Sequence, residues 1–309
     1  MRKRNRKYRK KQSTAIVILL STTIFIMAIG YGAFSTSINL NAKGNLKGKS
    51  RVIQSWDLYS NEDFHSDFYK ENIISATFTA TAIVPSNAAE KWDVSKNKDK
   101  GVMAYVTESP IETGKYDLYI GGDGGVIANH DSSYLFYKFI KLSTINFNNN
   151  YVTDNATDMS KMFSYCSNIV NVDVSSFNTK NVRNMLDMFG DMENLESVDL
   201  NNFDTPNLII LQGLFFNDVN LKIVKFGPNF DTSNVTRMYG LFYNCQSITT
   251  INLCNFNTSN VLDMKQMFMN TKKLENIYVG SGWNLNNALI DSMFSGSTIS
   301  SVTTGECPK

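Results

Sequence analysis

Histidine is scarce in this sequence, and His65 and His130 are the only two. Neither belongs to a recognisable catalytic or metal-binding motif, and no pair of acidic residues stands out from the rest. Acid–base catalysis and metal binding in proteins depend largely on such side chains. We therefore expect no enzymatic activity, no cofactor and no bound metal, and we keep a membrane-anchored hydrolase only as the last alternative.

Cysteine is also scarce, and four scattered residues in 309 do not suggest a disulfide framework. Cys166 and Cys245 stand at the same position of a sequence repeat, three repeats apart. Strands stacked about 4.7 to 4.9 Å apart would separate them by on the order of 14 Å, too far for a disulfide. We expect both to be small buried core groups, whereas the sequence does not assign the pairing of Cys254 and Cys307.

An excess of positive charge is missing outside the N-terminus. Eight of the 30 basic residues lie in the first eleven positions, which leaves 22 basic against 28 acidic residues, a net charge of −6. Nucleic-acid-binding surfaces are basic. We therefore expect no nucleic-acid partner.

An uncharged run of twenty residues, from Ala15 to Phe34, follows the basic N-terminus. As a helix it would be about 30 Å long, the thickness of a bilayer core. Positive charge before such a segment keeps that side in the cytoplasm. We predict a cytoplasmic segment at 1–13, a transmembrane helix or signal segment at 14–34, and export of the rest. Retention as a single-pass membrane anchor and cleavage with secretion both remain open.

Residues 35–50 are expected to be a polar linker, and a small β-rich region is expected at 51–130. Four runs of strand-like sequence between turn residues indicate this region. Its expected role is to cover the first repeat, whose apolar end would otherwise face water. The four runs are residues 51–59, 73–84, 101–108 and 115–122.

A repeat of 26 or 27 residues organises residues 131–298 into six units. Each unit begins with the spacing L-x-x-L-x-L of a short strand, followed by an aromatic residue and an Asn/Ser/Asp-rich turn. An apolar pattern then suits one face of a short helix, as with Val182, Met185 and Phe189. The leading residues of the six units are Leu142, Ile169, Leu195, Leu221, Ile248 and Leu274.

One such unit cannot bury its apolar face alone, so the units should stack in register. We predict an α/β fold, a leucine-rich-repeat-like solenoid with one short parallel strand and one short helix per unit. The β-rich region and the membrane segment precede this solenoid. Residues 299–309 are expected to form a C-terminal tail.

The units "NFDTSNVTRMYGLFYNC" and "VSSFNTKNVRNMLDMF", with "KWDVS", "VMAYV" and "YDLYIGGDGGVIA" before them, carry a resemblance. They resemble the BspA-type leucine-rich-repeat surface proteins of bacteria, which have a 26-residue repeat. The similarity extends over about Lys91 to Thr298. It implies an exported bacterial protein whose repeats serve binding or adhesion. The sequence departs from that family in having no recognisable C-terminal wall anchor.

Two columns of residues beside the central aliphatic position of each strand should point outward from the sheet. Most are neutral hydrogen-bonding groups that suit an extracellular protein or glycan, and Tyr278 adds an aromatic platform. The other interpretation is that these positions only keep the surface soluble. The candidate binding residues are Asp173, Asp199, Ile223, Lys225, Thr250, Asn252, Asn276 and Tyr278.

We therefore expect a non-enzymatic, exported cell-surface protein that binds or adheres to an extracellular protein or glycan. The alternative is a structural subunit of an extracellular matrix that is cleaved and released. The sequence identifies neither the ligand nor the oligomeric state.

Overall fold

The computed structural model describes residues 48–304 and 307–308. The chain divides into two compact units, residues 1–48 and 49–309. The predicted cytoplasmic segment 1–13, the membrane segment 14–34 and all but the end of the predicted linker 35–50 lie outside the described residues. Within the described ranges, no helix has the length and apolar character needed to cross a bilayer.

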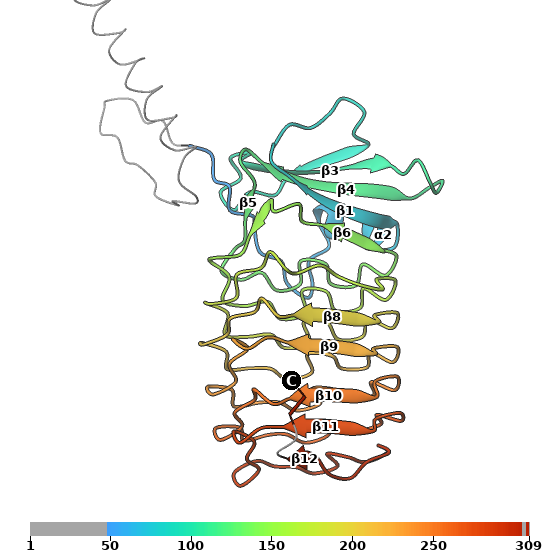
Figure 1. Ribbon diagram of the computed structural model, residues 1–309. Coiled ribbons are helices and arrows are strands. Elements are labelled where there is room, and N and C mark those ends of the chain that lie inside the picture. The colour runs from blue at the N-terminus through green and yellow to red at the C-terminus, as the bar shows by residue number, and fades with distance from the viewer. Residues whose placement is uncertain (1–47, 305–306, 309) are drawn as a thin grey trace, which may run out of the picture. The chain divides into compact units, whose positions relative to one another are not determined.

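A mixed five-stranded sheet, ordered β2-β3-β4-β1-β6, opens the second unit (Figure 1). Its β2–β3 and β3–β4 pairs are antiparallel, whereas β4–β1 and β1–β6 are parallel. Since β6 belongs to the first repeat, the β-rich region and the repeats share one sheet. The elements are the short helices η1 (Asp63–His65) and α2 (Asp67–Lys70), and the strands β1 (Ile73–Thr79), β2 (Glu90–Asp93), β3 (Val102–Glu108), β4 (Tyr116–Gly122) and β6 (Thr144–Asn146).

Three of the four predicted strand runs of this region are confirmed as β1, β3 and β4. In β1 the fully buried Ala76 and Phe78 alternate with partly exposed residues, as period-two patterning predicts. The run 51–59 forms only isolated bridges, at Val52 and Ile53. Strand β2 was not expected, because its sequence EKWD has no apolar alternation.

Extended segments form in the repeats where the L-x-x-L-x-L spacing predicts them. We call each repeat in the structure a coil and number the coils from one, which carries β6, to six, which carries β11. Pairing in parallel and in register joins coils two and three, coils three and four, and coils five and six. Coil two contributes only a bridge between Asn171 and Ser197. The other strands are β5 (Val126–Ile127), β7 (Tyr151–Val152), β8 (Ser197–Leu200), β9 (Ile223–Phe226), β10 (Thr250–Leu253), β11 (Asn276–Val279) and β12 (Thr303–Thr304).

The predicted short helix in each repeat is wrong, and the fold is mostly strand and turn rather than α/β. Among the described residues, η1 and α2 are the only helices, and neither lies in a repeat. Where a helix was expected, each coil has two positive-φ residues four positions apart, such as Asp187 (48°) and Asp191 (59°). A positive φ is incompatible with a right-handed helix, so these segments become successive turns.

These turn segments bond to the neighbouring coil rather than to themselves. Alternate backbone N–H groups, such as that of Asp187, donate to a carbonyl of the next coil, here Gln212, at 3.0 Å. The N–H groups between them, such as that of Met188, close tight turns to the residue three positions back, here Met185. Every coil is thereby hydrogen-bonded to the next on this side, including the pairs of coils whose strands form no ladder, which suits a tightly stacked solenoid.

Phenylalanine forms the spine of the continuous core. One phenylalanine per coil stacks on the next with ring centroids 5.5 to 6.0 Å apart. A fully buried side chain of this size stabilises a fold by about 1.5 to 3 kcal/mol, and stacking makes each coil the cover of the last. The spine consists of Phe163, Phe189, Phe215, Phe242, Phe268 and Phe294.

A ladder of buried threonines also joins neighbouring coils. The Thr179 hydroxyl donates to the Asp204 carbonyl at 2.9 Å and accepts from the Asp204 N–H at 3.0 Å. This two-way bridge satisfies both backbone groups of one residue in the next coil. The ladder consists of Thr153, Thr179, Thr205, Thr232 and Thr258.

The C-terminal residues close the far end of the stack. Strand β12 pairs in parallel with β11, placing Thr303 beside Tyr278 and Thr304 beside Val279. A disulfide then joins Cys307 to Cys254 at the end of β10, with the Cα atoms 5.9 Å apart. The chain therefore passes over coil six and is fastened to coil five, a pairing that the sequence left unassigned.

Candidate functional site

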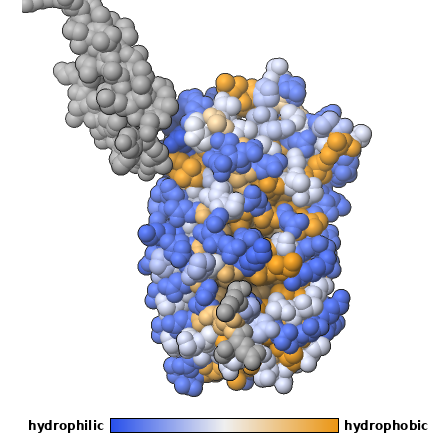
Figure 2. All heavy atoms as spheres, viewed as in Figure 1, coloured by the Kyte–Doolittle hydropathy of each residue, from blue (hydrophilic) through white to orange (hydrophobic). Residues whose placement is uncertain are grey.

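The structure brings the eight candidate binding residues onto one face of the stacked strands. The register sets Asp199 beside Lys225 and Asn252 beside Tyr278. Asn276 and Tyr278 are partly buried, and the other six are exposed. In Figure 2, viewed along the same direction as Figure 1, the surface is a mixture in which hydrophilic side chains dominate. The buried partners Val198, Leu200, Ile251, Leu253, Ile277 and Val279 alternate with them.

An open hollow of about 540 Å³ lies on this face, over coils two and three. Two of the candidates, Asp173 and Asp199, line it, whereas the other six lie outside it. The hollow is walled mainly by short polar side chains and contains no aromatic ring. Its lining is Asn171, Val172, Asp173, Val174, Ser175, Ser197, Asp199, Asn201 and Asn202.

Both aspartates of the hollow begin tight turns at the ends of their strand segments. Asp173 Oδ1 accepts the Ser175 N–H at 2.9 Å, and Asp199 Oδ1 accepts the Asn201 N–H at 3.0 Å. Asx turns of this kind are how aspartate and asparagine commonly end a strand. Hydrogen bonds from the Ser175 hydroxyl and N–H lower the pKa of Asp173, so this carboxylate is ionised at neutral pH.

The two carboxylates of the hollow differ in their ion pairing. Asp199 Oδ2 lies 3.3 Å from the Lys225 ammonium group, an ion pair in which both side chains are more than half exposed. Exposed pairs of this kind contribute little stability and exchange readily with solvent or ligand. Asp173 takes part in none of the ion pairs among the described residues. The hollow therefore offers two carboxylates on adjacent coils, one of which is weakly paired.

This set of groups suits a neutral ligand that is rich in hydroxyl groups. Sugar hydroxyls donate to carboxylates and accept from amide N–H₂ groups, and both kinds of group line the hollow. The Ser197 hydroxyl already donates to Asn171 Oδ1 at 2.6 Å, and the Asn202 amide donates to the Ser175 carbonyl at 2.9 Å. Two carboxylates side by side would repel an acidic ligand. In the described part of the chain, no group of three or more histidine, cysteine, aspartate or glutamate side chains gathers as a metal site.

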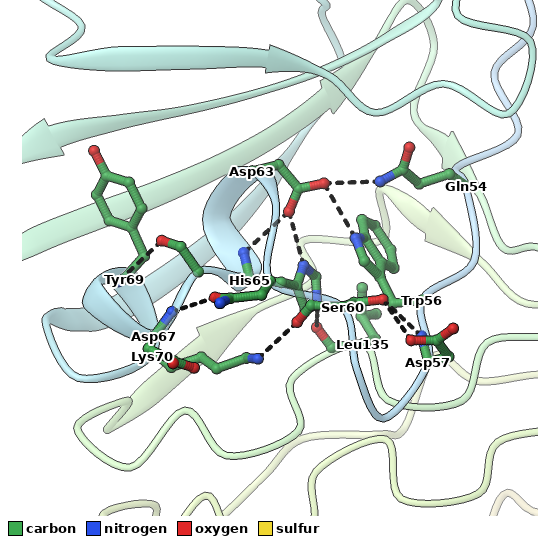
Figure 3. A network of polar contacts seen from close by, with 12 residues as sticks. Gln54, Trp56, Asp57, Ser60, Asp63, His65, Asp67, Tyr69, Lys70 and Leu135 are labelled. Carbon is green, nitrogen blue, oxygen red and sulfur yellow. Dashed lines mark hydrogen bonds and ion pairs between the residues drawn. The ribbon is translucent and has the colours of Figure 1, made fainter.

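The Asp63–His65 pair is the most enzyme-like arrangement of polar groups in the described structure (Figure 3). His65 Nδ1 lies 3.0 Å from Asp63 Oδ1, and Nε2 lies 3.0 Å from the Leu135 carbonyl oxygen. Asp63 Oδ2 accepts from the side chains of Gln54 and Trp56 at 2.8 and 3.2 Å. In a hydrolase triad, the second ring nitrogen faces a nucleophile. Here it faces a backbone carbonyl.

Burial lowers the pKa of His65 and outweighs the hydrogen bond and charge of Asp63, which raise it. The ring is 1% exposed and stacks on Trp56 with centroids 4.3 Å apart. A neutral imidazole ring carries one N–H group. It can therefore donate to only one of the two acceptors that face it, Asp63 Oδ1 and the Leu135 carbonyl oxygen. This geometry describes a structural link between η1 and the segment before coil one, in which Leu135 lies and the Phe136 N–H donates to the Met162 carbonyl of coil one at 2.8 Å.

The free thiols of Cys166 and Cys245 are fully buried, as the repeat pattern predicted. Burial raises the pKa of both thiols. Reactive cysteines are partly exposed thiolates. These two groups belong to the core.

Sequence comparison places the repeats in a described family. The profile "Mycoplasma protein of unknown function, DUF285" matches residues 130–226 and 211–304. The two matches together run from residue 130 to residue 304, which is 175 of 309 residues. No curated protein and no solved structure matches the chain. The chain therefore belongs to the DUF285 family of repeat proteins.

Proposed function

We propose that this protein is an exported, non-enzymatic surface protein whose strand face binds an extracellular ligand, with a neutral glycan as the best fit. The observation that carries the proposal is the hollow over coils two and three. It combines the carboxylates of Asp173 and Asp199 with amide and hydroxyl groups on two adjacent coils, which the Asn171–Ser197 bridge joins.

The disulfide supports the extracellular location in this proposal. Cystine bridges persist in oxidising compartments and are rare in the cytosol. The Cys254–Cys307 bond lies in the part of the chain that the proposed membrane segment, residues 14–34, would export. That segment acts in the proposal as a single-pass anchor in the cell membrane with its N-terminus in the cytoplasm.

Kinship with the BspA-type leucine-rich-repeat proteins is part of the same proposal. The repeat length of 26 or 27 residues and the parallel stacking of one short strand per repeat support it. The turn segments with two positive-φ residues per coil are a feature of this chain that a strand-plus-helix repeat does not have.

A glycan array probed with purified residues 49–309 tests the binding proposal. Replacing Asp173→Asn and Asp199→Asn together keeps the turn-forming oxygens but removes both charges. Since hydrogen bonds to charged groups exceed neutral ones by about 1 kcal/mol, we expect affinity for the best neutral glycan to fall about tenfold or more. The control variant Glu193→Gln/Asp291→Asn removes two exposed charges elsewhere and should bind normally. Equal binding by both variants would refute a role for the hollow.

Cell fractionation with external protease tests the anchor. We expect the full-length chain in the membrane fraction, with its repeats accessible from outside. A product in the medium that lacks the first 32 to 37 residues would instead support release after cleavage, as a structural subunit of an extracellular matrix requires.

A further inference from the structure

A second hollow lies on the β-rich region, far along the chain from the glycan site. It measures about 490 Å³ and is formed by the start of the described unit, the loop after β1, strands β2 and β3, and the turn after β4. Neither the sequence pattern nor the proposed function uses it. Its lining is Lys49, Ala82, Ile83, Val84, Lys91, Asp93, Lys100, Met103 and Asp123.

The two carboxylates of this hollow are occupied by the protein's own backbone. Asp93 accepts the N–H groups of Ser95 and Lys100 at 3.0 and 2.9 Å. Asp123 accepts the Ala82 N–H at 3.1 Å. These acidic groups therefore hold the walls of the hollow in place.

The three lysine side chains have no such partners. In the described ranges, none of the ion pairs includes Lys49, Lys91 or Lys100. Residues 49–309 contain 20 basic and 28 acidic residues, a net charge of −8, so three unpaired lysines around one hollow reverse the local sign of charge. Such a group of cations attracts an anionic partner.

The hollow also has an apolar component. Ile83 is 73% exposed, and Val84 and Met103 stand with it in the lining. Exposed apolar side chains among lysines match the boundary between lipid headgroups and acyl chains, where apolar burial and charge attraction act together.

Chain length places this hollow within reach of a membrane if residues 14–34 are a retained anchor, and this step rests on the proposed function. Fourteen residues, 35–48, lie between Phe34, the end of that segment, and Lys49. A fully extended chain spans about 3.3 to 3.6 Å per residue. The hollow therefore lies no more than about 50 Å from the bilayer surface.

We propose that the hollow lined by Lys49, Lys91 and Lys100 binds the phosphate of anionic phospholipid headgroups in the membrane that anchors the chain. The lysines neutralise the phosphate, and Ile83 and Met103 contact the interface. The β-rich region thereby docks on the bilayer and leaves the strand face of the repeats open to extracellular ligands.

Vesicle co-sedimentation tests this proposal with residues 49–309, a compact unit with its own continuous core. We expect binding to vesicles of equal parts phosphatidylglycerol and phosphatidylcholine, and none to phosphatidylcholine alone. Each lysine near an anionic surface strengthens binding about fivefold. The variant Lys49→Gln/Lys91→Gln/Lys100→Gln should therefore bind on the order of a hundredfold more weakly. Thermal unfolding of each variant checks that its fold is intact.

The control variant Lys180→Gln/Lys272→Gln/Lys273→Gln removes the same charge from exposed positions on the repeats. It should bind as the unaltered protein does.

If both variants lose vesicle binding equally, overall charge explains the loss and the proposed site is overturned. Absence of binding to phosphatidylglycerol vesicles would also overturn the site. Displacement by low millimolar inorganic phosphate would overturn the lipid source in favour of a small soluble anion. Because this chain lacks the anchor and the assay uses no glycan, failure here leaves the proposed function untouched.

Discussion

Asp218 is a carboxyl group enclosed in the core of the repeats, where the equivalent positions hold Cys166, Met192, Cys245 and Thr271. It is fully buried, and its Oδ1 accepts the Met192 N–H at 2.8 Å. Its Oδ2 has no hydrogen-bond partner among the described residues. Burial raises the pKa of Asp218 well above its ordinary value of 3.8. An unpaired buried charge is costly, so burial favours the neutral form of this carboxyl group.

Replacing Asp218→Asn should stabilise the protein at neutral pH. The unfolded chain releases the Asp218 proton near pH 3.8, whereas the folded chain retains it to higher pH. Stability is therefore complete below pH 3.8 and declines as the pH rises toward the folded-state pKa. Asparagine does not ionise, so we expect the variant to lose this decline and to gain stability relative to the unaltered protein as the pH rises. Urea denaturation between pH 4 and 8 measures it.

The exposed carboxylate of Glu193 supplies the control for this prediction. Glu193→Gln should leave the pH dependence of unfolding unchanged. If Asp218→Asn shows the same slope of stability against pH as the unaltered protein, the neutral buried carboxyl is disproved.

His65 should give the opposite pH dependence. Burial lowers its pKa below 6.5, so the unfolded chain takes up a proton before the folded chain does. Its contribution to stability is complete above pH 6.5 and is lost as the pH falls. We expect His65→Gln to remove this part of the acid sensitivity and to destabilise the protein by about 1 to 3 kcal/mol at pH 7.5, since the ring stacked on Trp56 is lost. Denaturation at pH 5 and 7.5 tests it.

The exposed His130 is the matched control, as the other histidine of the chain. His130→Gln should leave both stability and its pH dependence as they are. Acid sensitivity that persists in His65→Gln and disappears in His130→Gln would contradict the assignment to the buried ring.

At the scale of the element, the threonine ladder predicts a difference between two similar substitutions. Thr179→Val keeps the shape but leaves the Asp204 N–H and carbonyl without their bridge. We expect a loss of about 1 to 3 kcal/mol. Thr179→Ser keeps the hydroxyl and should cost less than about 1 kcal/mol. Thermal unfolding measures both, and the exposed Thr249→Val should change little. Equal effects of valine and serine at position 179 would argue against the ladder.

The elements show why the strands were predictable and the turn segments were not. L-x-x-L-x-L spacing has one structural solution in a stacked repeat, because only alternate side chains reach the core. Apolar spacing such as Val182, Met185 and Phe189 has two solutions. A helix buries these residues, and so does a run of turns that kinks at Asp187 and Asp191. Which one forms depends on hydrogen bonds to the next coil, and periodicity within one repeat does not encode those.

The candidate site was predictable in the same limited sense. Alternation predicted which side chains point outward, and Asp173 and Asp199 are among them. The hollow also depends on Ser175, Asn201 and Asn202, which follow the strand segments. Their positions result from the Asx turns, in which Asp173 and Asp199 bind the backbone two residues ahead. The D-x-S and D-x-N patterns at the ends of the strand segments of coils two and three were the available signal.

At the scale of the whole described unit, both ends of the stack of coils must be covered by other residues. The chain covers the two ends in different ways. At the first coil, β1 pairs with β6, so the sheet of the β-rich region continues the stack. At the last coil, only the two-residue strand β12 covers β11. An uncovered strand edge is prone to pair with other chains. So short a strand is weakly held by its own hydrogen bonds, and the Cys254–Cys307 disulfide keeps it in place.

Breaking this disulfide should therefore loosen the C-terminal end first. The 53-residue separation of the two cysteines predicts a stabilisation of about 4 kcal/mol if the loop-closure argument applies in full. We expect a loss of about 2 to 4 kcal/mol in Cys254→Ser/Cys307→Ser. Hydrogen exchange should accelerate most at Thr303, Thr304 and Val279.

Dithiothreitol provides an independent comparison, since Cys166 and Cys245 are buried thiols that form no disulfide. It should reproduce the effect in the unaltered protein and do nothing further to the double variant. Faster exchange that begins in coils two and three instead would contradict a fastening role for the disulfide. The disulfide at the C-terminal end affects the stability of the other coils, because each coil covers only its neighbour. An end that opens exposes the next coil, and loss of β12 would spread toward the face that carries Asn252 and Tyr278.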